Sequence, residues 1–128
     1  MRIGLTSIYV DDQDQAEQFS TQVLGFQVKT SAPYRQEERW ISVVAPEDPD
    51  GVQLVLHLAD EPARTFQQAS RQVGRPVLSL RTDDCQAEAE RLKAKGVVFT
   101  KEPGPMPYGG TDAVFADSCG NLLNLHQD

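Results

Sequence analysis

The sequence has few of the residues that mark disulfide-rich or zinc-binding proteins. It contains only two cysteines, Cys85 and Cys119, and only two histidines among its 128 residues. The two cysteines have no ligand-like spacing, so neither a disulfide framework nor a zinc motif is predicted. We therefore expect a reduced, cytoplasmic protein.

Long apolar runs and clusters of basic residues are also missing. No apolar run approaches the length of about 18 residues that a membrane-spanning helix needs, and no charged-then-apolar leader is expected. The formal net charge is −7, from 12 Lys and Arg against 19 Asp and Glu. An acidic chain without a basic run is a poor partner for nucleic acid or an anionic membrane. We expect neither as a partner, and no phosphate-binding loop is present.

What the sequence does contain is one pattern that occurs twice. The segment Ser7–Asp12 (SIYVDD) is repeated as Ser79–Asp84 (SLRTDD), and both end in two aspartates. A glycine follows each pair inside an apolar stretch, as Gly25 and Gly96. Such spacing predicts a helix that begins at the aspartates and ends at the glycine.

The two halves also end alike. Gly51–His57 (GVQLVLH) and Gly120–His126 (GNLLNLH) each place a glycine before an apolar strand, with a histidine six residues after the glycine. A repeat this long indicates two copies of one supersecondary unit. We expect the binding site where the two copies face each other.

The first half predicts the order β-α-β-β-β. Ile8 and Val10 alternate with Ser7 and Tyr9, as in a half-buried strand. Asp12 with Gln15 three residues later forms a capping-box pattern, and apolar residues then recur at helical spacing. The predicted elements are a strand at 3–10, a helix to about residue 24, and strands at 26–31, 39–45 and 52–58.

The second half repeats this order after a predicted linking helix at 62–73. Either Asp83 or Asp84 caps the second helix, whose apolar side carries Cys85; packing is the expected role of this thiol, although the first turn of a helix would stabilise a thiolate. The predicted strands are 76–82, 97–101, 112–116 and 121–127. The prolines and glycines of 103–110 predict an irregular loop, which serves as a lid or only as a connector.

The paired unit, with Leu24-Gly25-Phe26 in the first half and Asp117–Leu123 (DSCGNLL) in the second, resembles the vicinal oxygen chelate superfamily. That superfamily includes glyoxalase I, bleomycin-resistance proteins, fosfomycin-resistance enzymes and extradiol dioxygenases. The resemblance covers residues 3–127. It implies an α+β fold in which two tandem βαβββ modules form a curved mixed-sheet cleft, usually within a homodimer. We expect a single domain with modules at about 1–60 and 75–128.

Enzymes of this superfamily hold a divalent metal ion with ligands on four strands, commonly His or Gln, Glu, His and Glu. The resemblance places Leu5, His57, Val77 and Asn124 at these positions, with Val55 as the alternative to His57. Leucine and valine have no donor atom, and one imidazole with one amide falls short of three or four ligands. We therefore expect no metal cofactor. A nonstandard site with His57, Asn124 and His126 is the alternative.

Strand alternation predicts which side chains line the cleft. They offer an aromatic surface, hydrogen-bonding groups and one cation, which suits a small organic molecule. Arg81 could pair with a carboxylate or phosphate, or it could lie in solvent. Trp40 could line the cleft or belong to the core. Tyr108 could close over a ligand or be an exposed loop residue. The candidates are Tyr9, Trp40, Ser42, Gln53, His57, Ser79, Arg81, Tyr108 and Asn124.

These features favour a metal-independent homodimer that binds a small molecule, for sequestration or sensing. The alternative is a metal-dependent lyase, isomerase or dioxygenase of the same superfamily. A third hypothesis is a metal-free enzyme that uses Tyr9 or His57 as general acid–base.

Overall fold

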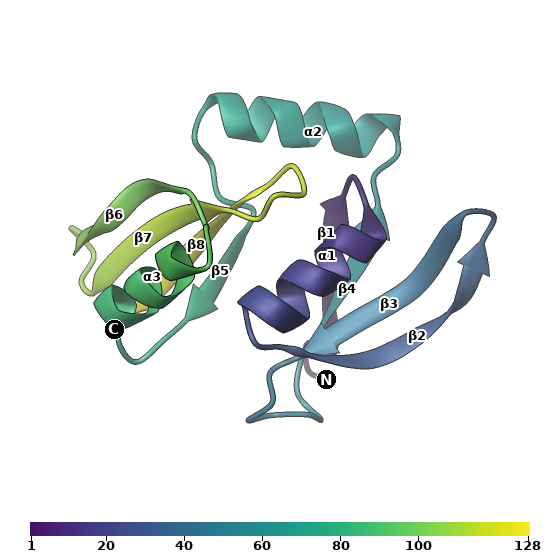
Figure 1. The fold of residues 1–128 in the computed structure, drawn as a ribbon, viewed down its shortest axis with the longest axis horizontal. Coiled ribbons are helices and arrows are strands. Elements are labelled where there is room, and N and C mark those ends of the chain that lie inside the picture. The colour runs from purple at the N-terminus through teal and green to yellow at the C-terminus, as the bar shows by residue number, and fades with distance from the viewer. The chain divides into compact units, whose positions relative to one another are not determined.

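The computed structural model describes residues 1–128 and consists of two units, Met1–Thr65 and Phe66–Asp128. Each unit contains one four-stranded mixed sheet with a helix against one of its faces (Figure 1). The predicted duplication of a βαβββ module is therefore confirmed. No helix is long and apolar enough to cross a membrane.

The first unit begins with a strand and a helix. The strand β1 (Leu5–Val10) leads into α1 (Gln13–Gln18), and one π-helical segment, Phe19–Val23, continues this helix. Three further strands follow, and the sheet order is β1-β4-β3-β2, with β1 parallel to β4 and the other neighbours antiparallel. These strands are β2 (Gln27–Arg35), β3 (Glu38–Val44) and β4 (Gln53–Leu58).

Local sequence explains where α1 begins and ends. The Asp12 carboxylate accepts a hydrogen bond from the Gln15 backbone N–H at 2.9 Å, which satisfies a donor that the first turn leaves free. Gly25 adopts φ +82° beyond the last turn, a conformation that favours glycine. The prediction of one helix ended by Gly25 is confirmed, except that its second half is π-helical.

The second unit has the same strand order. The helix α2 (Glu61–Gln72) spans the boundary between the units, since the division falls between Thr65 and Phe66. Asp84, rather than Asp83, caps the second helix of the repeat by accepting from the Ala87 backbone N–H. The elements are β5 (Leu78–Arg81), α3 (Cys85–Ala94), β6 (Phe99–Pro105), β7 (Thr111–Ala116) and β8 (Leu122–Gln127), in the sheet order β5-β8-β7-β6.

The buried face of each sheet packs against its helix. In the second unit Cys85, Ala89 and Leu92 form the buried side of α3. The Cys85 thiol lies 3.8 Å from the Leu125 carbonyl oxygen, and burial raises its pKa. A raised pKa opposes thiolate formation. Packing is therefore the role that the structure gives Cys85.

The predicted starts of β1, β5 and β6 are two residues too early, and the predicted ends of β2 and β6 are four residues too early; all four strands lie at sheet edges. The strand β2 continues to Arg35 instead of ending at residue 31, and β6 continues to Pro105 instead of ending at 101. Each contains proline, which an edge strand accepts because one side of it has no partner strand. The predicted loop at 103–110 is consequently shorter, and its turn is closed by the hydrogen bond from Met106 N to Gly110 O.

Candidate functional site

The first sheet has one face against α1 and one face away from it. Arg39 marks the helix-bearing face, since its guanidinium contacts Asp14 and Glu17 of α1. Trp40 and Ser42 alternate with Arg39 and Ile41, so they lie on the opposite face, which we call the first open face. The strand register adds Tyr9, Gln53 and His57 to it, as alternation predicts. Five of the predicted site residues therefore share one face.

Four rings form a continuous row on the first open face. The ring centroids of Tyr9 and His57 lie 5.8 Å apart, and those of His57 and Trp40 lie 5.5 Å apart. Trp40 in turn contacts Tyr34 of β2 edge to face, at 5.5 Å between centroids. We call these four residues the aromatic row. Tyr9 and Tyr34 at its two ends are 41% and 45% exposed.

Polar groups lie beside the aromatic row. The Glu38 Oε1 atom is 3.6 Å from His57 Nδ1 and accepts a hydrogen bond from the Leu58 backbone N–H. The Ser42 hydroxyl donates to Gln53 Oε1 at 2.8 Å. Glu38 and Tyr34 were not among the predicted residues. Glu38 has the same parity as Trp40, so a strand prediction that began one residue earlier would have included it.

The second sheet likewise has an open face, on the side away from α3. The Asn124 amide donates to the Ser79 hydroxyl at 2.9 Å, and these residues are opposite each other on β8 and β5. Arg81 and His126, two residues further along the same strands, are the next opposed pair on this face. Of the predicted residues, Ser79, Arg81 and Asn124 therefore lie together on this second open face.

Asp112 connects Tyr108 to His126. Its Oδ1 atom lies 2.5 Å from His126 Nδ1, and the Tyr108 hydroxyl donates to its Oδ2 atom. Burial alone would raise the pKa of Asp112, but hydrogen bonds from Tyr108, His126 and Asn124 outweigh it and lower the pKa. The same hydrogen bond to Asp112 raises the pKa of Tyr108. Tyr108 is thus tied to the second sheet, although 69% of it is exposed.

Each histidine has an acidic neighbour that alternation along its own strand does not reveal. Glu38 reaches His57 from β3, and Asp112 reaches His126 from β7.

No group of three His, Cys, Asp or Glu side chains suited to a metal ion occurs in the chain. The residues at the four superfamily positions do not fit a metal ion well. Leu5 and Val77 have no donor atom, and the Asn124 amide already donates a hydrogen bond to Ser79.

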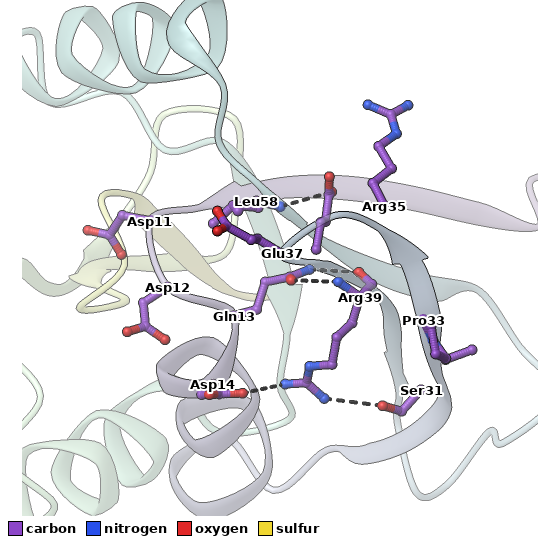
Figure 2. A pocket seen from close by; sticks show the side chains of 12 residues that line it. Asp11, Asp12, Gln13, Asp14, Ser31, Pro33, Arg35, Glu37, Arg39 and Leu58 are labelled. Carbon is purple, nitrogen blue, oxygen red and sulfur yellow. Dashed lines mark hydrogen bonds and ion pairs between the residues drawn. The ribbon is translucent and has the colours of Figure 1, made fainter.

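The first unit also has a cavity of about 720 Å³ at the hairpin of β2 and β3 (Figure 2). Gln13 and Arg39 both line this cavity. The buried Gln13 side-chain amide donates to the Arg39 carbonyl and accepts from the Arg39 backbone N–H, which holds the two residues together. Figure 2 shows the Arg39 side chain held between Asp14 and Ser31. Hydrogen bonding to Glu17 raises the pKa of Arg39. The lining has no aromatic residue and none of the predicted site residues.

A model of the Glyoxalase/Bleomycin resistance protein/Dioxygenase superfamily matches residues 2–125. The chain belongs to this superfamily. The expectation drawn from the duplicated βαβββ pattern is thereby confirmed.

Two relatives span almost the whole chain. The uncharacterized protein YurT of Bacillus subtilis (strain 168) is 44% identical over 128 residues, which is 99% of each chain. A probable lactoylglutathione lyase of Vibrio parahaemolyticus is 27% identical and covers 99% of this chain and 91% of its own.

Two solved structures are similar over the full length. UcmS2 has a TM-score of 0.83 and 33% identity, with 100% of this chain and 98% of that chain covered. TnmS3, an antibiotic binding protein from Streptomyces sp. CB03234, has a TM-score of 0.78 and 29% identity, with 99% and 95% covered.

Proposed function

We propose that this protein binds a small aromatic organic molecule on its first open face, and that it does so without a metal ion. The observation that carries the proposal is the aromatic row, Tyr9, His57, Trp40 and Tyr34, with centroids 5.5 to 5.8 Å apart. Rows of amphipathic rings supply a large contact area at a small cost in conformational entropy. The face is not covered by the helix of its own unit.

The polar neighbours of the row would give the ligand a fixed orientation. Glu38 and Gln53 lie on the same face and offer a carboxylate and an amide, and the buried Ser42 hydroxyl holds the Gln53 side chain in place. A few convergent polar groups in an aromatic lining are typical of sites for small organic molecules. Sequestration or sensing then requires binding alone, with no bond made or broken.

One of the compared structures supports a binding role. TnmS3 binds an antibiotic by its own description and is 29% identical to this chain over nearly all of both. We propose that the ligand here is also an antibiotic or a similar natural product. The Vibrio relative, which is named a probable lactoylglutathione lyase, favours the metal-dependent alternative. It is 27% identical to this chain.

A cofactor-free site is part of the proposal. A divalent ion needs three or four nitrogen or oxygen donors, and the superfamily positions here hold Leu5, His57, Val77 and Asn124. The row therefore contacts the ligand directly, and His57 contributes a ring and a hydrogen-bonding nitrogen.

We also propose that the protein is a cytoplasmic homodimer. The exposed apolar side chains Ile3 and Leu5 lie at the start of β1, an edge strand. A second copy that covers this patch would remove it from water. The two free, buried cysteines suit a reducing compartment. Ile3→Glu should give a monomer in sedimentation equilibrium, whereas Val73→Glu, at a similarly exposed valine of the other unit, should not.

A ligand screen tests the proposed function. Chelator-treated protein is heated in the presence of bleomycin and a panel of other aromatic antibiotics, and the unfolding temperature is followed. A ligand that raises this temperature without any metal supports the proposal. Stabilisation only after a divalent metal is added, or lactoylglutathione lyase activity with that metal, would favour the enzymatic alternative.

A further inference from the structure

We infer that the second unit contains a separate binding site for the carboxylate group of a small organic anion, formed by Arg81 and His126. This site shares no residue with the aromatic row and does not depend on the proposed function. Its two members come from neighbouring parallel strands, β5 and β8, where they are directly opposite each other. Both side chains therefore rise from the same face of the sheet.

A carboxylate already occupies this position. One oxygen of the Asp128 side chain contacts the Arg81 guanidinium, and the other lies 3.1 Å from His126 Nε2. A planar guanidinium is well matched to a planar carboxylate, which it can bind through two parallel hydrogen bonds. Asp128 thus acts as an internal ligand and shows which chemical group the site accepts.

The His126 ring is held in the orientation that this contact requires. Its Nδ1 atom lies 2.5 Å from Asp112 Oδ1, so Nε2 is directed to Asp128. Asp112 is itself fixed by the Tyr108 hydroxyl, and Lys101 donates to the Asp112 backbone carbonyl at 3.1 Å. The doubly protonated ring has an N–H at each nitrogen, so it can donate through Nδ1 to Asp112 and through Nε2 to a ligand carboxylate.

A free carboxylate can displace the internal one. The Arg81 and Asp128 side chains are 74% and 62% exposed, and exposed ion pairs contribute little to stability. The remaining partners of the site, His126 and Asp112, are only 25% and 6% exposed and stay in place when Asp128 moves. Asp128 consequently lowers the affinity for external carboxylates without abolishing it.

Sodium benzoate is a suitable probe, with neutral benzamide as the matched control. Titration into isotope-labelled protein is followed by NMR at the side-chain signals of His126 and Arg81. Benzoate should shift both signals to saturation, and benzamide should not. Asp128→Asn should tighten benzoate binding about two- to fivefold, since a weak internal competitor is removed. Arg81→Gln should weaken binding by about fivefold or more.

The control variant is Arg75→Gln, which alters the net charge equally at another exposed arginine of the same unit. It should leave benzoate binding unchanged. Equal loss in Arg75→Gln and Arg81→Gln would show that only the overall charge matters, and would overturn the inference. So would an unchanged affinity in Asp128→Asn, or benzoate shifts confined to Trp40 and its neighbours.

Discussion

Trp40 and His57 lie on the neighbouring strands β3 and β4, with their ring centroids 5.5 Å apart and their planes at 80°. This edge-to-face geometry is a favourable one for aromatic pairs, so the two rings hold each other in place. Tyr34 also packs edge to face against Trp40, at an interplanar angle of 71°. The row is therefore ordered before a ligand arrives, which lowers the entropic cost of binding.

Loss of the central ring should weaken ligand binding strongly. We expect Trp40→Leu to cost about 2 kcal/mol of binding free energy, or roughly thirtyfold in Kd, because large aromatics dominate such contacts. Isothermal titration calorimetry with the antibiotic selected by the thermal screen measures this change. Phe66→Leu, at an aromatic residue that is 52% exposed on α2, is the control and should bind normally. Equal affinities for all three proteins would show that the row is not the site.

Purified protein should contain no stoichiometric metal. Untagged protein prepared without chelator and re-exposed to nickel, zinc, manganese and iron should carry well under one ion per chain, because the superfamily positions supply too few donors. Mass spectrometry measures the content, and His57→Ala should leave it unchanged. About one ion per chain, lost in His57→Ala, would replace the binding proposal with the enzymatic one.

Sequence alternation placed His57 and Trp40 on one face because strand parity depends only on local order. It missed Tyr34, since the predicted strand ended at residue 31, whereas β2 continues to Arg35 along a sheet edge that accepts Pro33. It also missed the pairing of Asp112 with His126, which depends on the register between β7 and β8. Register is set by tertiary packing and turn geometry, so a single sequence does not disclose it.

The buried Gln13 amide should be important for the stability of the first unit. It donates to the carbonyls of Arg39 and Leu56 and accepts from the Arg39 N–H, at 2.8 to 3.0 Å. Gln13→Leu leaves these backbone groups without a partner and should lower the free energy of unfolding by about 2 to 3 kcal/mol. Urea denaturation measures the loss. The exposed Gln68→Leu should change stability by less than about 0.5 kcal/mol.

Asp112 should contribute to stability in a manner that depends on pH. Its pKa is lowered in the folded state, so its contribution is complete above the unfolded pKa of about 4 and is lost as pH falls through the lower, folded pKa. Asp112→Asn should therefore be less stable than wild type at neutral pH, by about 1 to 3 kcal/mol. The difference should shrink below about pH 4. A difference that stays constant from about pH 7 to pH 3 would contradict this role.

Both cysteines should be unreactive in the folded protein. Cys85 and Cys119 are 0% and 1% exposed, and burial raises the pKa of Cys85. A reagent that gives a coloured product with free thiols should not react with either cysteine of the native protein at a measurable rate. After denaturant is added, two thiols per chain should react. Rapid labelling of one thiol in native protein would show that the fold opens around it.

The most direct test of metal-free ligand binding uses Trp40, the only tryptophan of the chain, as its own reporter. Chelator-treated protein is titrated with the selected aromatic antibiotic while tryptophan fluorescence is recorded. Saturable quenching at one ligand per chain, unchanged when metal is restored, is the predicted result. Quenching that appears only with added metal, or a ligand that is chemically converted during the titration, would contradict the account.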